Sequence, residues 1–201
     1  MANADRPSGL KPVQYINGTP WTGGGRVYCI LSTEDTYAYA IGDPVDLAGG
    51  ADSAGVPAVV LATAGSTNLV TGVIVGMAGT KYGAAYGDPA TPNTTIIPAT
   101  KTKNYYVLVC DDPNVIFEIQ EVSGGTALTA ANVSKNASLV SGTNNGYISG
   151  WELDNSTEAT TAALQLKILQ LAPRGDNAIG EHAKWWVLLN NHRYRTGVAG
   201  V

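Results

Sequence analysis

The sequence has few charged side chains, few cysteines and no long apolar run. Only 14% of its 201 residues are charged and the formal net charge is −4, whereas roughly 25% charged is usual for a domain. A weakly acidic chain lacks the basic field that general nucleic-acid binding requires, so we expect no direct nucleic-acid partner. The most apolar stretch, residues 70–78, is interrupted by Gly72 and Gly76. It is too short to span a membrane, so we expect no membrane partner.

The two cysteines, Cys29 and Cys110, are too few for a disulfide scaffold or a zinc site. Both lie in apolar, strand-like runs, which predicts buried free thiols. The first nine residues are polar and lack the apolar segment of a secretion signal. We therefore expect the chain to be made and assembled in a cytoplasm.

Short runs rich in Val, Ile, Tyr and Trp recur along the chain, and Gly, Pro, Asn and Asp separate most of them. This pattern is typical of strands and predicts an all-β barrel- or sandwich-like fold. The length suits one β domain over residues 26–201. The single helical turn that we expect lies at residues 128–133, with Thr126 or Thr129 as its N-cap. The predicted strands are 26–31, 58–62, 72–78, 104–110, 115–121, 150–153, 163–171 and 184–190.

Three of these strands carry further predictions. Residues 111–114 are four turn-forming residues between two strands, so we expect strands 104–110 and 115–121 to form a hairpin. In residues 163–171 the apolar alternation slips by one position, which predicts a β-bulge or a barrel corner. Residues 184–190 are apolar on both faces, so that strand should be covered on both sides, by its own fold or by a partner.

The first 25 residues differ from the rest, because Pro7, Pro12, Pro20 and the three glycines at 23–25 disfavour regular structure. We expect an extended N-terminal arm, residues 1–25, that docks on a neighbouring molecule. The alternative is a tail that folds back over its own domain. The apolar side chains predicted to contact a neighbouring molecule are Tyr15, Ile16 and Trp21 of the arm. Trp185 and Trp186 of the last strand are predicted to lie in the core or at a subunit contact.

No motif for catalysis, for cofactor binding or for metal binding is present. His182 and His192 have no metal-ligand spacing, so we expect both at the surface or at an interface. The pair Asp111–Asp112 precedes Pro113 and fits a turn better than acid–base chemistry. We interpret Glu118 and Glu121 as solvated. The chain is therefore predicted not to be an enzyme and to hold neither a cofactor nor a metal ion.

Two short stretches near the C-terminus have alternative interpretations. The sequence Arg174-Gly175-Asp176 matches a cell-adhesion tripeptide, but its flanking Pro and Asn favour a tight turn. Residues 193–195 form a small basic and aromatic group. It could touch nucleic acid, but a solvated tail or a salt-bridging contact fits better.

Four stretches of the sequence carry a resemblance to a known family. They are MANADRPSGLKPV at 1–13, DDPNVIFEIQ at 111–120, residues 152–171 beginning with ELD, and residues 174–192 with RGDN, AKW and NNH. In these stretches the chain resembles small head proteins of tailed bacteriophages, with capsid decoration (cement) roles. The resemblance implies a tulip- or jelly-roll-type β domain on the capsid surface of a virion, often as a trimer at symmetry axes.

The function expected from this resemblance is binding to the outer surface of an icosahedral phage head, where the chain would stabilise capsomer contacts. Its partners would be the major capsid protein and two further copies of itself in a homotrimer. The alternative is a receptor- or glycan-binding module of a head fibre or tail. In that case Tyr82 and Tyr86 of the long loop at 79–102 could stack on sugar rings.

Overall fold

The chain is all-β, as its alternating apolar pattern predicts. A computed structural model describes residues 3–34, 36–78 and 95–195, and in these residues the only helical element is a 3-10 turn, η2, at Ala130–Asn132. Among the described residues, no helix has the length and apolarity needed to cross a bilayer. The strands are β1 (Lys11–Tyr15), β2 (Arg26–Ile30), β3 (Tyr39–Ala40), β4 (Pro44–Ala51), β5 (Pro57–Leu61), β6 (Gly72–Ala78), β7 (Ile96–Ile97), β8 (Tyr105–Cys110), β9 (Val115–Gln120), β10 (Asn136–Val140), β11 (Glu152–Ala159), β12 (Leu166–Leu171) and β13 (Lys184–Leu189).

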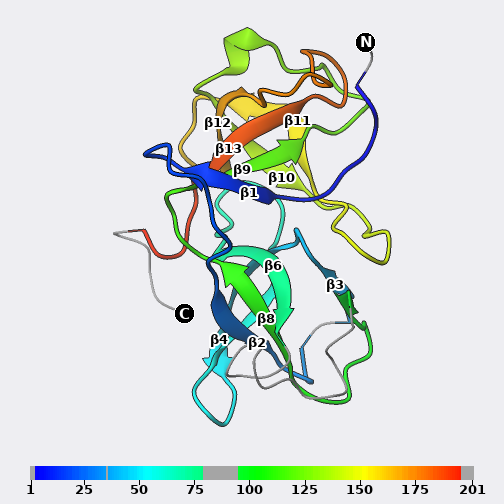
Figure 1. Ribbon diagram of the computed structural model, residues 1–201, viewed down its shortest axis with the longest axis vertical. Helices are drawn as coiled ribbons and strands as arrows, with labels where there is room; N and C mark the ends of the chain where they lie inside the picture. The colour runs from blue at the N-terminus through cyan, green and yellow to red at the C-terminus, as the bar shows by residue number, and fades with distance from the viewer. Residues whose placement is uncertain (1–2, 35, 79–94, 196–201) are drawn as a thin grey trace.

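The strands between residues 26 and 110 build a closed barrel in the order β2-β5-β4-β6-β8, with the short pair β3–β7 beside it (Figure 1). Alternate side chains of a strand point to opposite faces, so each barrel strand sends part of its apolar set inward. Closure also leaves the barrel without the unpaired edge of an open sheet. The interior is filled by Tyr28, Ile30, Tyr39, Val45, Val59, Ile74, Ile97, Val107 and Val109, all of them buried.

The strands after residue 110, together with β1, form a six-stranded sheet in the order β1-β9-β13-β12-β10-β11, drawn in the upper half of Figure 1. Each neighbouring pair in it is antiparallel. In β9, Val115, Phe117 and Ile119 are at most 1% exposed, as their period-two spacing requires. They pack with Trp185 and Val187 of β13 in the core of the sheet.

The barrel and the sheet are joined along one continuous apolar contact and by a buried amide. Val70, Val73 and Cys110 belong to the same core cluster as the sheet residues. Gln165, which is fully buried, donates to the carbonyl of Thr63 at 2.9 Å and accepts from the amides of Gly65 and Leu139 at 3.0 and 3.2 Å. Because its partners lie in the β5–β6 loop and in β10, the Gln165 side chain links the barrel to the sheet.

Several local predictions are confirmed. Thr129 is the N-cap of η2, and the pairing of β12 with β13 shifts register between Ile168 and Gln170, where a bulge was expected. Cys29 and Cys110 are buried free thiols.

The predicted hairpin is wrong, because β8 pairs with β2 and β6 inside the barrel, whereas β9 pairs with β1 and β13 in the sheet. Residues 111–114 do turn the chain, with Asp112 accepting from the Asn114 amide at 2.8 Å. That turn carries the chain from the barrel to the sheet, so it joins the two parts of the fold and does not connect neighbouring strands.

The structure does not confirm an extended N-terminal arm. Lys11–Tyr15 pairs with β9 of the same chain as β1, and Leu10 is 1% exposed within the core. Figure 1 shows the N-terminal segment running along the sheet before it enters the barrel at β2. In these described residues the segment lies on its own chain, as the alternative prediction had it.

Candidate docking surface

Three segments that are far apart in the sequence cross where the barrel meets the sheet. The Leu10 amide donates to Gly42 O at 3.1 Å, and the Gly42 amide donates to Ile74 O at 2.8 Å. The crossing is so close that a Cβ on Gly9 would lie 2.3 Å from Gly42 O, and one on Gly42 would lie 2.4 Å from Ser8 O. Both glycines also have positive φ, +63° and +94°, which side chains disfavour. Glycine is therefore required at both positions.

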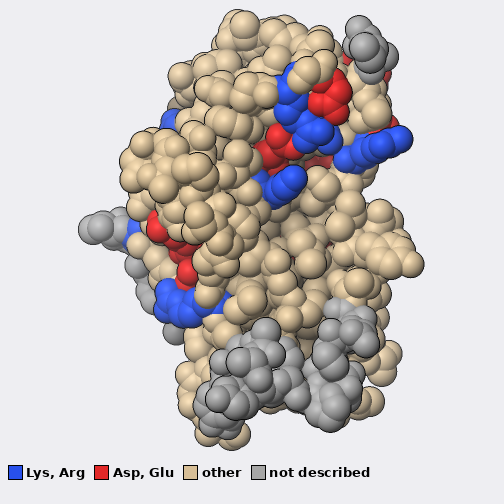
Figure 2. Space-filling model, viewed as in Figure 1, with Lys and Arg blue, Asp and Glu red and all other residues tan. Residues whose placement is uncertain are grey.

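This crossing forms the floor of an apolar groove with a volume of about 250 Å³. The groove lies between the start of β1 and strand β6, and Trp21 is among the residues that line it. In the view of Figure 2, one group of charged side chains lies over the sheet and a second lies at the left edge of the band between sheet and barrel, while the middle of that band is uncharged. The lining residues are Ser8, Leu10, Lys11, Pro12, Trp21, Ile41, Gly42, Ile74, Val75 and Ile148.

Large apolar side chains on the rim of the groove remain exposed. Ile41 is 39% exposed and Ile148 is 36% exposed, and the two form an isolated parallel β-bridge. The neighbouring Tyr147 is 67% exposed. Asn145 fixes the loop that presents them, because its side-chain oxygen accepts from the amides of Tyr147 and Ile148 at 3.0 Å each. The rim is therefore held in place by the fold while its apolar surface faces solvent.

A buried carboxylate lies directly behind the groove. Asp43 has no exposed surface, and its Oδ2 accepts from the Ala40 amide at 2.8 Å. Burial raises the pKa of Asp43 to about 6, although hydrogen bonds from Ala40, Ser149 and Tyr37 work in the opposite direction. The protonation of this group therefore bears on the stability of the crossing that forms the groove.

Of the five predicted contact residues, one lines the groove. Trp21 does so, with its amide held by Val13 O at 3.0 Å. Tyr15 is partly buried at the end of β1, and Ile16, in the turn that follows, is 59% exposed. Trp185 is fully buried in the core of its own chain, and Trp186 is partly buried on the other face of β13. The structure therefore does not bring these five side chains together.

The residues that sequence reasoning missed are Ile41, Tyr147 and Ile148. Each belongs to a loop or a strand end, so no periodic pattern marks it. The one available signal is the apolar pair Tyr147-Ile148 inside a polar run of Asn, Gly and Ser. Such a pair should be costly in a solvated loop unless something covers it.

Two predictions about titratable residues are wrong. His192 is fully buried within its own chain, where a position at the surface or at an interface was expected, and its Nδ1 accepts from the Tyr194 amide at 3.0 Å. Burial lowers the pKa of His192 to about 4. Glu121 is also fully buried, where solvation was expected, and it accepts from the Leu128 amide at 3.0 Å. Burial raises the pKa of Glu121 to about 7. Neither position is marked in the sequence, because the covering segments come from elsewhere in the chain.

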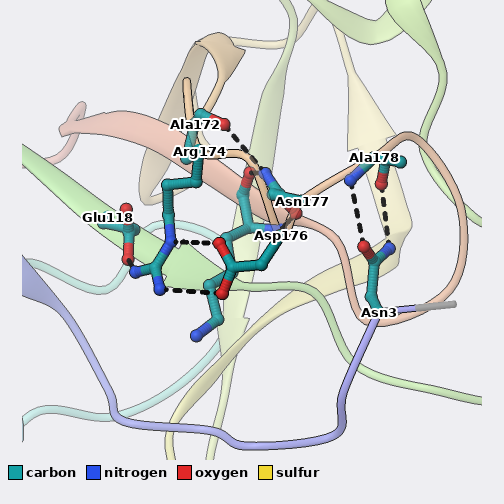
Figure 3. A network of polar contacts seen from close by, with 8 residues as sticks. Asn3, Glu118, Ala172, Arg174, Asp176, Asn177 and Ala178 are labelled. Atoms are coloured by element: carbon teal, nitrogen blue, oxygen red, sulfur yellow. Dashed lines mark hydrogen bonds and ion pairs between the residues drawn. The ribbon is translucent and has the colours of Figure 1, made fainter. Parts of the chain in front are cut away.

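The Arg174–Asp176 tripeptide forms a turn, as predicted, and its guanidinium is already occupied. Arg174 donates to Glu118 at 2.9 Å and to both oxygens of Asp176 at 3.0 and 3.1 Å (Figure 3). Next to this turn, Asn3 exchanges two hydrogen bonds with the backbone of Ala178, at 2.8 and 3.0 Å. The network ties the N-terminal segment to the loop between β12 and β13.

The basic and aromatic residues 193–195 include a salt bridge, which is one of the interpretations that the sequence allows. Arg193 pairs with Asp46 of β4, and the Tyr194 hydroxyl lies 2.8 Å from that of Tyr28. The residues with the predicted sugar-stacking role, Tyr82 and Tyr86, lie outside the described residues.

Comparison of the chain with protein-family models, with curated proteins and with solved structures found no match. The resemblance to phage head proteins therefore stays a prediction from the sequence. Among the described residues, one group of side chains brings three possible metal-ligand atoms within 4.8 Å of one another: Asp5, Glu152 and His182.

Proposed function

We propose that the chain is a non-enzymatic structural protein that docks through its apolar groove onto the outer surface of a viral capsid. The observation that carries this proposal is the groove itself, which is lined by the exposed Ile41 and Ile148 at a crossing of three segments, with the exposed Tyr147 next to Ile148 in the chain. Contiguous exposed apolar surface of this kind marks interaction sites. The resemblance of the sequence to capsid decoration proteins supports the choice of a capsid as the partner.

The composition suits contact with another protein. Interface centres are depleted in charged residues and enriched in aromatic ones, and the groove has Trp21 and Tyr147 on or near its rim with Lys11 as the one charged lining residue. A decoration protein repeated over a symmetric shell can work with modest individual contacts, because many copies act together. The proposed partners are therefore the major capsid protein and further copies of this chain, most simply as a trimer at a symmetry axis.

The proposal is tested with capsids that lack this protein and with a charge introduced on the rim. Ile148→Asp should weaken co-sedimentation with capsids at least about tenfold, because a carboxylate in an apolar contact loses its hydration without gaining a partner. The backbone bridge of residue 148 does not need its side chain, so circular dichroism should remain that of the folded protein.

Ile179→Asp is the matched control, because Ile179 is 50% exposed but does not line the groove. It should bind capsids like the unchanged protein. Full capsid occupancy by Ile148→Asp, or an equal loss in both variants, would contradict docking through the groove.

Tyr147 favours a second candidate function, glycan binding by a head-fibre or tail module. A tyrosine ring that is 67% exposed on a fixed loop offers an apolar face that a sugar ring could cover. A glycan array separates the two candidates: reproducible hits that Tyr147→Ser abolishes would favour the second, and an array without hits beside tight capsid binding would favour the first.

A further inference from the structure

Asp5, Glu152 and His182 come from three separate places and converge on one point. Asp5 lies in the N-terminal segment, Glu152 begins β11, and His182 lies in the loop between β12 and β13. One ligand atom from each lies within 4.8 Å of the other two. The closest recorded pair, His182 Nδ1 and Asp5 Oδ1, is 3.5 Å apart. Ligands around a tetrahedral ion with bonds of about 2.1 Å lie about 3.4 Å apart, so these atoms are close to coordination distances.

A buried amide orients the two carboxylates. Gln120 is 1% exposed, and its Nε2 donates to Asp5 at 2.9 Å and to Glu152 at 3.0 Å. Its oxygen is fixed in turn, because it accepts from the Arg6 amide at 2.9 Å. Outer residues that hold metal ligands in this way strongly affect metal affinity. The carboxylates keep further lone pairs that the amide does not use.

The cluster carries excess negative charge and an unsatisfied nitrogen. Among the described residues, neither Asp5 nor Glu152 forms an ion pair with Lys or Arg. Nδ1 of His182 is buried and finds no hydrogen-bond partner among the described residues. A cation at this point would offset the repulsion and satisfy the nitrogen.

We propose that Asp5, Glu152 and His182 bind one divalent transition-metal ion, Zn²⁺ in preference to Ca²⁺ or Mg²⁺. An imidazole with two carboxylates suits Zn²⁺, whereas Ca²⁺ and Mg²⁺ prefer sites made of oxygen alone. There is room for a water molecule to complete the coordination, because Asp5 borders a cavity of about 350 Å³ and His182 borders another of about 250 Å³. The ion would add a further link between the N-terminal segment and the six-stranded sheet, beside the hydrogen bonds that Asp5 and Arg6 form with Gln120 of β9.

The test is a calorimetric titration of the untagged, full-length protein with Zn²⁺, followed by thermal unfolding with and without the ion. We expect one Zn²⁺ per chain and, at a hundredfold excess over Kd, a rise in Tm of about 5 °C or more. Asp5→Asn and His182→Asn should each weaken Zn²⁺ binding at least about tenfold. Asparagine tolerates the positive φ of 60° at position 182.

Glu181→Gln is the matched control, because this exposed carboxylate neighbours His182 but is not part of the cluster. It should bind Zn²⁺ like the unchanged protein. The proposal would be overturned if micromolar protein with a 100-fold molar excess of Zn²⁺ showed neither a heat of binding nor a shift in Tm. So would unchanged binding by a folded His182→Asn variant, or Ca²⁺ binding as tight as that of Zn²⁺.

Discussion

Replacing Asp43 with Asn should make the protein less sensitive to pH between 4 and 7. Asp43 is fully buried behind the groove, and burial raises its pKa from 3.8 to about 6. A carboxyl group whose pKa is raised by folding binds its proton more tightly in the folded state. Its contribution to stability is therefore highest below pH 3.8 and is lost as the pH rises through about 6.

The magnitude follows from the size of the shift. Two units of pKa correspond to about 3 kcal/mol in the free energy of unfolding, and about 2 kcal/mol of this falls between pH 4 and pH 7. The Asn side chain keeps an oxygen that can accept from the Ala40 amide and cannot ionise. Relative to the unchanged protein, Asp43→Asn should gain about 2 kcal/mol as the pH rises from 4 to 7.

The assay is urea unfolding of both proteins at a series of pH values. The difference between them isolates Asp43, because His192 and Glu121 titrate equally in both. His192 acts in the opposite direction, since its lowered pKa costs stability as the pH falls below 6.5. A difference between variant and parent that stays constant from pH 4 to pH 7 would refute the reasoning.

Two further predictions concern the core and the joint between the two parts of the fold. Trp185→Ala should lower the free energy of unfolding by about 3–5 kcal/mol, because Trp185 is fully buried in its own chain. Urea unfolding measures this change. A loss of oligomerisation with unchanged stability would contradict the prediction. Gln165→Ala should cost about 1–3 kcal/mol, because it leaves the buried amide of Leu139 without its acceptor and removes the hydrogen bonds to the more accessible backbone of Thr63 and Gly65. Backbone amides at the joint between barrel and sheet should then exchange their hydrogens faster. Unchanged exchange at this joint would contradict the role given to Gln165.

The regular strands could be predicted from the sequence, and the pairing of strands could not. Apolar alternation marks β9 and the bulge in β12, because each side chain there reports on its own burial. The alternation says nothing about partners, so β8 and β9 were assigned to one hairpin although they belong to different parts of the fold. β1, β4 and β10 were missed because Pro, Gly or polar residues weaken their apolar pattern.

The candidate site could be predicted only in part. Trp21 is a conspicuous aromatic in a Pro- and Gly-rich segment, and it does line the groove. Ile41, Gly42 and Ile148 become neighbours only through the crossing of distant segments, which no local pattern reveals. For the same reason, the convergence of Asp5 with His182 over an interval of almost the whole chain has no sequence signature.

The central claim is that the groove between barrel and sheet faces a viral shell, and a reconstruction of the assembled particle tests it most directly. The account predicts density for this chain on the outer capsid surface, with Ile41, Tyr147 and Ile148 buried against the shell. It also predicts clusters of copies at symmetry axes. Density in which the groove faces solvent, or in which the chain occupies only a fibre or tail, would contradict the account.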